Sequence, residues 1–412
     1  MPKLKGVILS IEDVLVRQGE QGDGGAAIFA EVTKFIKYLR GTKTEFVVMT
    51  NRRWTVGNDK RPLSQMLKDM WGDFTYLCRA EDGSIPAKPR AEATEYVLNR
   101  MGWKSNEVVY IGASESDMQT AVNGGLLFLR ATWYANKTDY GFEFDSLKDI
   151  ARFIDTFCFR EHLWCHEVKV GNFEYYALAP FSTMKPQYTL YSEDARNAAK
   201  HGLGHPDFWV GALVSSLYFS GIYSRINYIA VYPGHKAGSG NDVMNDAMAI
   251  FGKCFRKNYI SDLIVRHTTA LKSQTARNQG LPLDHLNQLN TIVLNKTPLR
   301  TPTARYKSPP LGKGKTVLVI DDICTRGFSL EAARTYVEQT GAKAILVSWL
   351  KTINTDIDEL APYNKFDPYK PPRFTSQIKS KSHSYHGNIV DNLAPAELKE
   401  VFSQYESWDW PV

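Results

Sequence analysis

The sequence predicts an α/β protein with two doubly wound, Rossmann-like parallel sheets, one in each half of the chain. Strand and helix patterns alternate over residues 5–130, and the alternation returns between residues 226 and 350. Repeated units of this kind form parallel sheets with helices on both faces. A third observation is the run TVLVIDDICTRGFS at Thr316–Ser329, in which an apolar strand pattern leads through two carboxylates into a loop and an amphipathic run.

The bulk composition is that of a soluble globular chain with two or three domains. The chain has 412 residues, 43% of them hydrophobic and 23% charged. No apolar run reaches the roughly 20 residues that cross a bilayer, so we expect no membrane partner. The net charge of +6 suits anionic substrates such as phosphates and does not argue for nucleic acid. The cysteines are few, scattered and odd in number, which predicts a reducing, cytoplasmic setting.

The N-terminal third has the clearest alternation. The predicted strands are Val7–Ile11, Phe46–Thr50, Phe74–Cys78, Val108–Ile111 and Leu126–Leu129, and the predicted helices are Ala27–Leu39, Leu63–Met70, Ala91–Met101 and Ser116–Val122. In such a sheet, ligands bind at the carboxyl ends of the strands.

Polar residues stand at several of these strand ends. Thr50 and Asn51 close a strand, Lys88 and Pro89 precede a helix, and Asp117 lies in the run IGASESDM that follows another strand. In order and spacing over about 130 residues, these motifs resemble those of haloacid dehalogenase-like (HAD) phosphatases. The resemblance implies that Thr50 and Lys88 can hold a phosphate by hydrogen bonding and charge, and that Asn51 and Asp117 are further remnants of the family's motifs.

The first motif of that family departs from the pattern. The family carries an aspartate nucleophile and an acid/base aspartate where this chain has Ser10 and Glu12, and Ala113 stands where a further acid is usual. Without those carboxylates, neither a covalent phosphoryl step nor Mg²⁺ binding is expected. Residues 1–135 are therefore predicted to be a HAD-like domain that lacks phosphatase activity and serves as a scaffold. A phosphate-metabolite sensor and a residual hydrolase using Glu12 or Asp13 remain alternatives.

Residues 136–165 are predicted to be a linker region with a helix at Leu147–Cys158. Cys158, His162, Cys165 and His166 are close enough in sequence for a zinc site, but a helix with buried cysteines explains them equally. Beyond the linker we expect strands at Val168–Pro180 and Gln187–Tyr191, and helices at Glu193–His201 and Phe208–Tyr218.

The most informative stretch joins a strand at Thr316–Ile320 to a helix at Leu330–Gln339. Asp321 and Asp322 follow the strand and suit a neighbouring group with paired hydroxyls. The loop that begins at Thr325 places backbone amides at a helix N-terminus, where an anion is favoured. Gly327 allows close approach of the backbone. A diol next to a phosphate describes a ribose 5-phosphate.

The run Val317–Ser329 resembles the 5-phosphoribosyl-1-pyrophosphate (PRPP) motif of type I phosphoribosyltransferases. The resemblance implies a phosphoribosyltransferase domain with a hood at 166–351 and a C-terminal extension at 352–412. It makes Asp321 and Asp322 the catalytic pair that holds the ribose hydroxyls. It implies that the 5-phosphate is bound by Thr325, Arg326, Gly327, Phe328 and Ser329.

Two further segments fit pyrophosphate. A strand at Ile226–Val231 ends in a loop containing Gly234, His235 and Lys236, whose amides and cation suit an anion. Arg266, with Thr268 and Gln274 after it, resembles the ComF-like branch of the family and is a plausible pyrophosphate clamp. Lys272 and Arg277 are equally available by charge. The Pro- and Lys-rich segment 295–315 is predicted to be a mobile loop able to close over pyrophosphate.

These resemblances imply a glycosyltransferase of the pentosyl-transfer class. It would move phosphoribose from PRPP to an unidentified nitrogenous small-molecule acceptor and release pyrophosphate, with Mg²⁺ bound through PRPP and not directly by the protein. Thr325 occupies the place where 6-oxopurine enzymes carry an aspartate base, which argues against hypoxanthine or guanine.

Two other functions stay open: a non-catalytic PRPP- or nucleotide-binding effector, by analogy one serving phage defence, and a bifunctional transferase–phosphatase. A homo-oligomer and partner proteins from an accessory operon are compatible with the sequence. A helix at Pro395–Tyr405 is expected, followed by Trp408 and Trp410, which should dock on the body or on another subunit.

Overall fold

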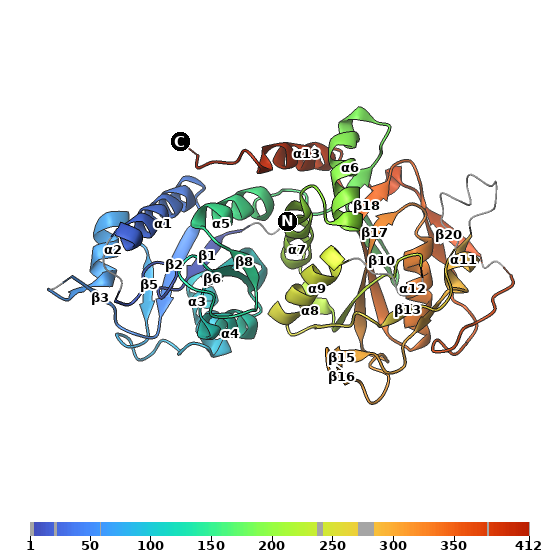
Figure 1. The fold of residues 1–412 in the computed structure, drawn as a ribbon, viewed down its shortest axis with the longest axis horizontal. Coiled ribbons are helices and arrows are strands. Elements are labelled where there is room, and N and C mark those ends of the chain that lie inside the picture. Colours follow the sequence, from blue (N-terminus) through green and yellow to red (C-terminus); the bar gives the residue numbers. More distant parts are fainter. Residues whose placement is uncertain are drawn as a thin grey trace.

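The computed structural model describes residues 4–19, 23–57, 59–236, 242–270, 284–376 and 379–411. It contains two six-stranded sheets, each with helices packed on its faces, and the two sheets lie side by side along the long axis of the molecule (Figure 1). The α/β class with two doubly wound sheets is therefore confirmed. None of the helices in these ranges has an apolar stretch long enough to cross a membrane.

The first sheet is wholly parallel, with strand order β5-β2-β1-β6-β7-β8. Every strand and helix predicted in this third of the chain is present within a few residues of its predicted bounds. The strands are β1 (Gly6–Leu9), β2 (Glu45–Thr50), β5 (Thr75–Cys78), β6 (Val108–Gly112), β7 (Leu127–Ala131) and β8 (Phe142–Phe144). The helices are α1 (Asp23–Gly41), α2 (Leu63–Trp71), α3 (Ala91–Met101) and α4 (Glu115–Gly124), and a small hairpin joins β3 (Thr55–Val56) to β4 (Arg61–Pro62).

This sheet continues past residue 135, where we predicted the domain to end. Strand β8 pairs in parallel with β7, so part of the expected linker extends the sheet. Helix α5 (Leu147–Phe153) packs against α1, and a π-helical turn follows at Ile154–Cys158. Strand β8 is only three residues long, and so short a run shows hardly more than one alternation of apolar and polar side chains. The sequence pattern is therefore too weak to predict a strand here.

The second sheet has the order β12-β11-β17-β18-β10-β9 and is parallel except for β9, which runs antiparallel to β10. Its strands are β9 (His166–Val170), β10 (Phe173–Phe181), β11 (Tyr228–Val231), β12 (Asn258–Tyr259), β17 (Thr316–Cys324) and β18 (Lys343–Thr352). The helices are α6 (Pro186–His201), α7 (Pro206–Phe219), α8 (Ile222–Arg225), α9 (Asp242–Cys254), α11 (His285–Leu289) and α12 (Phe328–Gln339). Two short strands, β13 (Ile264–Arg266) and β14 (Ile292–Leu294), pair only with each other.

Two predicted elements in this half are wrong. The single strand expected at 168–180 is the antiparallel pair β9 and β10, which a turn at Gly171 and Asn172 separates. Residues 187–191 form the start of α6 and not a strand. The tyrosines in that run favour a strand by propensity, but Pro186 occupies the first turn of the helix, where proline needs no amide hydrogen bond. The local start signal therefore outweighs the strand propensity of the aromatic side chains.

The two sheets share one apolar core. A single cluster of buried residues includes Val7 of β1, Leu217 of α7 and Leu318 of β17. Polar contacts cross the same boundary: the Tyr218 hydroxyl donates to the Val108 carbonyl oxygen at 2.7 Å, and the Asn106 amide donates to the Phe219 carbonyl oxygen at 2.9 Å.

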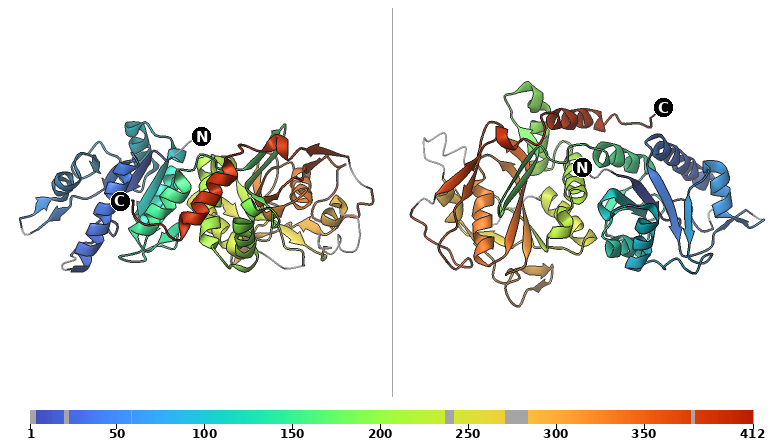
Figure 2. Two further views of the ribbon diagram at one scale, coloured as in Figure 1. Left: turned by 90° about the horizontal axis from the view of Figure 1, so that it is seen from above. Right: turned by 180° about the vertical axis from the view of Figure 1, so that it is seen from behind.

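The C-terminal extension lies along both halves. It forms the hairpin β19 (Ile357–Leu360) and β20 (Ser380–His383), a 3₁₀ turn at His386–Asn388, and helix α13 (Ala394–Tyr405). Figure 2 shows α13 crossing over the region between the two sheets. The Trp408 indole donates to Asp155 at 2.8 Å, and the ring of Trp410 lies 6.2 Å from that of Tyr38 in α1. These tryptophans dock on the body of the same chain.

Candidate functional site

The candidate site lies at the carboxyl edge of the second sheet, where β17 ends. The strand is longer than predicted and carries Asp321 and Asp322 within it. Its pairing with β11 stops at Ile320, whereas its pairing with β18 continues to Cys324. The two carboxylates therefore stand beyond the last paired residue of β11, where the sheet leaves room beside them.

The two acids differ in their surroundings. Successive strand residues point to opposite faces of a sheet, and Asp321, but not Asp322, is among the residues that line a cavity of about 70 Å³ at the strand end. The pKa of Asp321 lies well above its ordinary value, first because the side chain is withdrawn from water and then because the Asp322 carboxylate is adjacent. Hydroxyl donors from a ligand would favour the ionised form of this pair.

The loop after the strand has the conformation of an anion cradle. Gly327 has φ of 84° and caps α12, which begins at Phe328 and not at Leu330 as predicted. The amides of Phe328 and Ser329 therefore belong to the first helical turn, whose N–H groups have no helical acceptor. The same cavity is lined by the whole loop, together with Asp284, Asn287 and Gln288 of the neighbouring α11 segment.

Residues beyond β17 hold this loop in place. The Thr325 carbonyl oxygen accepts from the Lys351 ammonium at 2.5 Å, and the Thr325 hydroxyl lies 3.0 Å from that of Thr352. The Arg326 guanidinium is paired with Asp358 of β19 at 2.6 Å. Together with the hydrogen bond from the Asp358 amide to the Arg326 carbonyl oxygen, this ion pair ties the loop to β19.

Sequence reasoning missed both Lys351 and Asp358. Lys351 has a local signal, because it is a charged residue in the apolar strand ILVSWLK and is fully buried. Burial lowers its pKa, although the nearby Cys324 thiol, Asp356 and Asp358 act in the opposite direction. Asp358 has no such signal, since its partner Arg326 is distant in sequence.

The loop expected to bind pyrophosphate follows β11 at the same edge. Gly234, His235 and Lys236 lie there, and the rest of that loop, residues 237–241, is outside the described residues. Arg266 is 3% exposed and donates to the carbonyl oxygen of Gly234, to Thr291 at 2.6 Å and to Gln288 at 3.0 Å. Its guanidinium therefore anchors the loop and does not face a ligand, contrary to the prediction that Arg266 clamps pyrophosphate. Lys272, Gln274 and Arg277 also lie outside the described residues.

The segment 295–315 does not take the place we predicted for it. It contains a small hairpin, β15 (Leu299–Thr301) and β16 (Ala304–Arg305), which Asp262 holds by an ion pair with Arg305 at 3.1 Å. The Tyr306 hydroxyl accepts from Asn258, the first residue of β12, at 2.7 Å. The hairpin therefore lies at the amino edge of the sheet, opposite the acid pair, and is not positioned to close over pyrophosphate.

The first sheet carries a second polar cluster at its own carboxyl edge. The Lys88 ammonium donates to Asp117 at 2.7 Å, to Ser10 at 3.1 Å and to the Tyr110 hydroxyl at 3.3 Å. The second carboxylate oxygen of Asp117 accepts from the Ser114 hydroxyl at 2.7 Å and from its amide at 3.1 Å. Both carboxylate oxygens of Asp117 are thus engaged by protein donors.

Within this cluster, the Lys88 ammonium neutralises the Asp117 carboxylate. Burial acts to raise the pKa of Asp117, but the Lys88 ammonium and hydrogen bonds from Lys88 and Ser114 outweigh it, so the pKa lies below its ordinary value. Asn51 holds the backbone of Lys88 through two hydrogen bonds of 2.9 Å. The Thr50 hydroxyl accepts from the Trp54 indole.

Glu12 is apart from this cluster and forms an ion pair with Arg52. The structure therefore brings Ser10, Lys88 and Asp117 together and leaves Glu12 at the rim.

The zinc site that the sequence spacing suggested is not formed in the part of the chain that the structure describes. Within the described ranges, no group of three or more His, Cys, Asp or Glu side chains is arranged to hold a metal ion. Cys158 and Cys165 are buried free thiols, and His162 pairs with Glu397 at 2.8 Å. The sequence spacing that suggested zinc is accounted for by packing and this ion pair.

Comparisons with known proteins find solved structures that are similar to part of the chain. No family model and no curated protein matches the sequence. A HAD-superfamily hydrolase from Ehrlichia chaffeensis is similar to 38% of this chain and 98% of its own, at 14% identity and a TM-score of 0.27. A cobalt-bound deoxy-D-mannose-octulosonate 8-phosphate phosphatase from Haemophilus influenzae is similar over 37% of this chain and 88% of its own, at 16% identity and a TM-score of 0.27.

A provisionally named phosphoglycolate phosphatase from Lactobacillus delbrueckii subsp. bulgaricus is similar over 31% of this chain, at 21% identity and a TM-score of 0.26. This chain spans 53% of the length of that protein.

Proposed function

We propose that the chain is a PRPP-dependent phosphoribosyltransferase whose first sheet belongs to a HAD-like domain without phosphatase activity. One observation carries the proposal: Asp321, the first of two adjacent carboxylates, and the open N-terminus of α12 line one cavity at the carboxyl edge of the second sheet. Ligands of doubly wound sheets bind at this edge. The strand end offers carboxylates as acceptors for hydroxyls, and the loop that follows offers backbone amides as donors for a phosphate.

In the proposed complex, the amides of Gly327, Phe328 and Ser329 bind the 5-phosphate, and the positive end of α12 favours its charge. Asp321 and Asp322 accept from the ribose hydroxyls. Mg²⁺ would be held mainly by PRPP and water and not directly by the protein, which suits its reluctance to lose its hydration shell. His235 and Lys236 lie on the neighbouring strand end, toward which the pyrophosphate would extend, and Arg266 positions their loop.

The chemical step breaks the bond between C1 of the ribose and the pyrophosphate oxygen. Positive charge develops at C1, and carboxylates beneath the ring stabilise it more than they stabilise the ground state. The pyrophosphate leaves with the bonding electron pair, and a nitrogen of the acceptor forms the new bond to C1. The protein contributes by holding both reactants in line and by supplying fixed charges.

The first sheet is assigned no hydrolytic step. A HAD-type reaction needs a carboxylate nucleophile and free carboxylate oxygens for Mg²⁺. Ser10 carries no carboxylate, and Lys88 and Ser114 already engage both oxygens of Asp117. We infer that this cluster stabilises the fold.

Release of pyrophosphate from PRPP and Mg²⁺, measured with a panel of nitrogenous acceptors, tests the proposal. We expect acceptor-dependent release, reduced by about 100-fold or more in Asp322→Asn, because removing a preorganised charge costs several kcal/mol in the transition state. Asp59→Asn, an exposed aspartate of the first domain, is the control.

Other outcomes replace the proposal. PRPP binding that Asp322→Asn abolishes, without release for any acceptor, would make the chain a PRPP-binding effector. Absence of PRPP binding would reject the site altogether. Magnesium-dependent hydrolysis of p-nitrophenyl phosphate, lost on Glu12→Gln, would restore the bifunctional transferase–phosphatase.

A further inference from the structure

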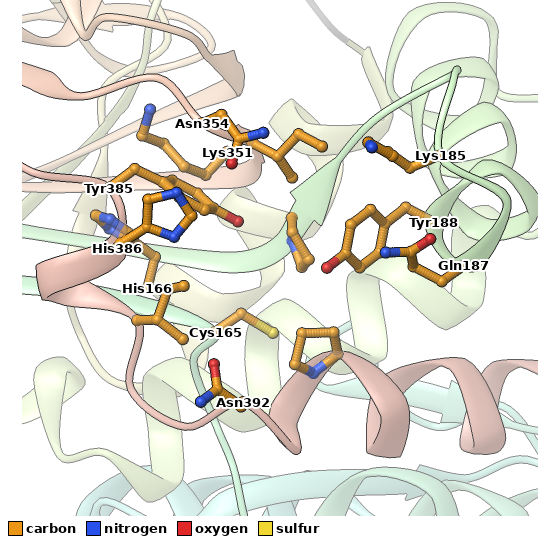
Figure 3. A pocket seen from close by; sticks show the side chains of 14 residues that line it. Cys165, His166, Lys185, Gln187, Tyr188, Lys351, Asn354, Tyr385, His386 and Asn392 are labelled. Carbon is orange, nitrogen blue, oxygen red and sulfur yellow. The ribbon is translucent and has the colours of Figure 1, made fainter.

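A second cavity, of about 240 Å³, opens at the carboxyl ends of β10 and β18 (Figure 3). Five parts of the chain form it: the start of β9, the end of β10, the end of β18, the first turn of α6, and the C-terminal extension around the 3₁₀ turn. Its walls thus combine the hood with the extension, and none of its lining residues lines the cavity at the end of β17.

The lining is basic and aromatic. Its fourteen residues include two lysines, two histidines, two tyrosines and three side-chain amides, but no aspartate or glutamate. A cavity with donors and cations and without carboxylates suits a ligand that carries negative charge or several oxygen acceptors.

Two tyrosines define the shape of this cavity. In Figure 3, Tyr188 of α6 and Tyr385 of the extension point toward one another from opposite sides. The Tyr385 ring stacks on His166, with ring centroids 5.5 Å apart and planes at 22°, and the Lys351 ammonium lies 5.7 Å from the same ring. Their hydroxyl ends, and not their ring faces, approach from the two sides of the opening, so both can form hydrogen bonds with oxygen or nitrogen atoms of a ligand between them.

The charge that a ligand would meet comes from Lys185. This residue is exposed at the rim, and its ammonium forms no ion pair within the part of the chain that the structure describes. Lys351 contributes positive potential from below, but its ammonium donates to the carbonyl oxygen of Thr325 and to the hydroxyl of Thr355. Lys185 is therefore the cation available to an anionic group.

The buried wall of the cavity has unmet hydrogen-bonding capacity. His166 is 2% exposed, and neither of its ring nitrogens has a hydrogen-bond partner. An unpaired buried polar group costs about 1–3 kcal/mol.

The cavity is adjacent to the acid pair. Lys351 of β18 is the register partner both of Cys324 in β17 and of Pro180 in β10. The hydroxyls of Thr325 and Thr352 meet at 3.0 Å between the two cavities. Both cavities therefore open along the same edge of the sheet, and this one lies on the side away from β11 and its expected pyrophosphate loop.

We propose that this cavity binds a small organic anion with a carboxylate or ionised oxygen, which lies between Tyr188 and Tyr385 with its charge at Lys185. That this anion is a nitrogen heterocycle and the acceptor rests on the proposed transfer function; its charge does not. In the transfer, a ring nitrogen forms the bond to C1 while the C1–O electron pair leaves with pyrophosphate, and any proton on that nitrogen passes to water.

Matched pairs of probes test the ligand class. Pyridine-3-carboxylate and uracil-6-carboxylate are titrated into the full chain without PRPP, each beside its uncharged carboxamide, by calorimetry. We expect at least one carboxylate to bind about tenfold more tightly than its carboxamide. Lys185→Gln should remove that preference and Tyr188→Leu should weaken both members of the pair. Lys200→Gln, at an exposed position of the same helix, should leave the preference unchanged.

Equal affinity for acid and amide, binding of neither acid, or a preference that survives Lys185→Gln would each overturn the ligand assignment. The proposed transferase is judged separately. Acid binding that depends on Lys185, without pyrophosphate release from PRPP, keeps the cavity and rejects the transfer. Release with uncharged acceptors, unaffected by Lys185→Gln, keeps the transfer and rejects the cavity as its acceptor site.

Discussion

Gly327 fixes the conformation of the phosphate loop. Its φ of 84° is in the left-handed region, and a Cβ added there would lie 2.7 Å from the Cγ1 atom of Ile357 in β19. A side chain at this position is opposed both by the backbone conformation and by the tail strand that packs on the loop. Both the backbone conformation and the packing therefore require glycine at this position.

We predict that Gly327→Ala weakens PRPP binding by at least tenfold and lowers the free energy of unfolding by about 2–4 kcal/mol, the sum of backbone strain and overpacking. Gly314→Ala is the control, because Gly314 has φ of 81° but no atom within 4 Å of an added Cβ. It should show only the backbone cost of about 1 kcal/mol. Titration of PRPP and urea unfolding of both variants measure the difference, and equal losses in the two would contradict the packing argument.

His166 gives the molecule a pH-dependent stability. Burial, followed by the Lys351 ammonium, lowers the pKa of His166 to about 4. Because the unfolded chain takes up a proton near the ordinary pKa of about 6.5 and the folded chain does not, stability is lost as the pH falls from 6.5 toward 4.

Between pH 7.5 and pH 5, this group should remove about 2 kcal/mol from the free energy of unfolding. We predict that His166→Leu reduces the wild-type loss over this interval by about that amount, in urea unfolding at the two pH values. His201→Leu, at an exposed position of α6, is the control for the substitution. A loss in His166→Leu as large as in the wild type would show that His166 is charged in the folded chain.

The sequence predicts some residues of the candidate site and not others. The acids and the glycine of the loop lie in one continuous run, so their proximity follows from local spacing. The partners of Arg326, Thr325 and Arg266 come from distant segments. Asp358, Lys351 and Thr291 become neighbours only when the sheet and its tail have assembled.

At the scale of elements, the main difference is the length of β17. The apolar pattern ends at Ile320, and a strand predicted from that pattern ends with it. Hydrogen bonding to β18 carries the strand four residues further, to Cys324. A cross-strand partner of this kind cannot be seen in the local sequence, and it is the reason that Asp321 and Asp322 are held on a rigid strand instead of in a loop.

The polar cluster of the first sheet ties β1 and α4 to the loop that carries Lys88. Lys88 and Asp117 are 8% and 1% exposed in their side chains and are 2.7 Å apart. We predict that Lys88→Met lowers the free energy of unfolding by about 3–5 kcal/mol, because it leaves a buried carboxylate without its partner.

The double variant Lys88→Met/Asp117→Asn should recover most of that loss, since the charge is then gone and the amide oxygen of the asparagine can still accept from Ser114. Chemical unfolding of the wild type, both single variants and the double variant completes the cycle. Additive losses would mean that the two side chains act independently, and the structural role assigned to this cluster would be withdrawn.

At the scale of the whole molecule, the two sheets are joined by a common core. The buried cluster runs from β1 through α7 to β17, and helix α13 with Trp408 packs over the junction. The sequence predicts each sheet but not this union, because the contacts join residues more than a hundred positions apart, such as Val108 and Tyr218.

We predict that the chain unfolds in a single calorimetric transition that includes both sheets. Tyr218→Phe removes the hydroxyl that donates to the Val108 carbonyl, and the buried acceptor left behind should cost about 1–3 kcal/mol. The transition should then move to lower temperature without dividing. Two resolved transitions in the wild type would show that the sheets are thermodynamically separate.

The site at the end of β17 is tested most directly by a crystal structure of the protein with PRPP and Mg²⁺. We predict the 5-phosphate on the amides of Gly327, Phe328 and Ser329, the ribose hydroxyls on Asp321 and Asp322, and C1 facing the cavity of Tyr188 and Tyr385. A complex in which PRPP binds elsewhere, or crystals that stay free of ligand at millimolar PRPP, would contradict it.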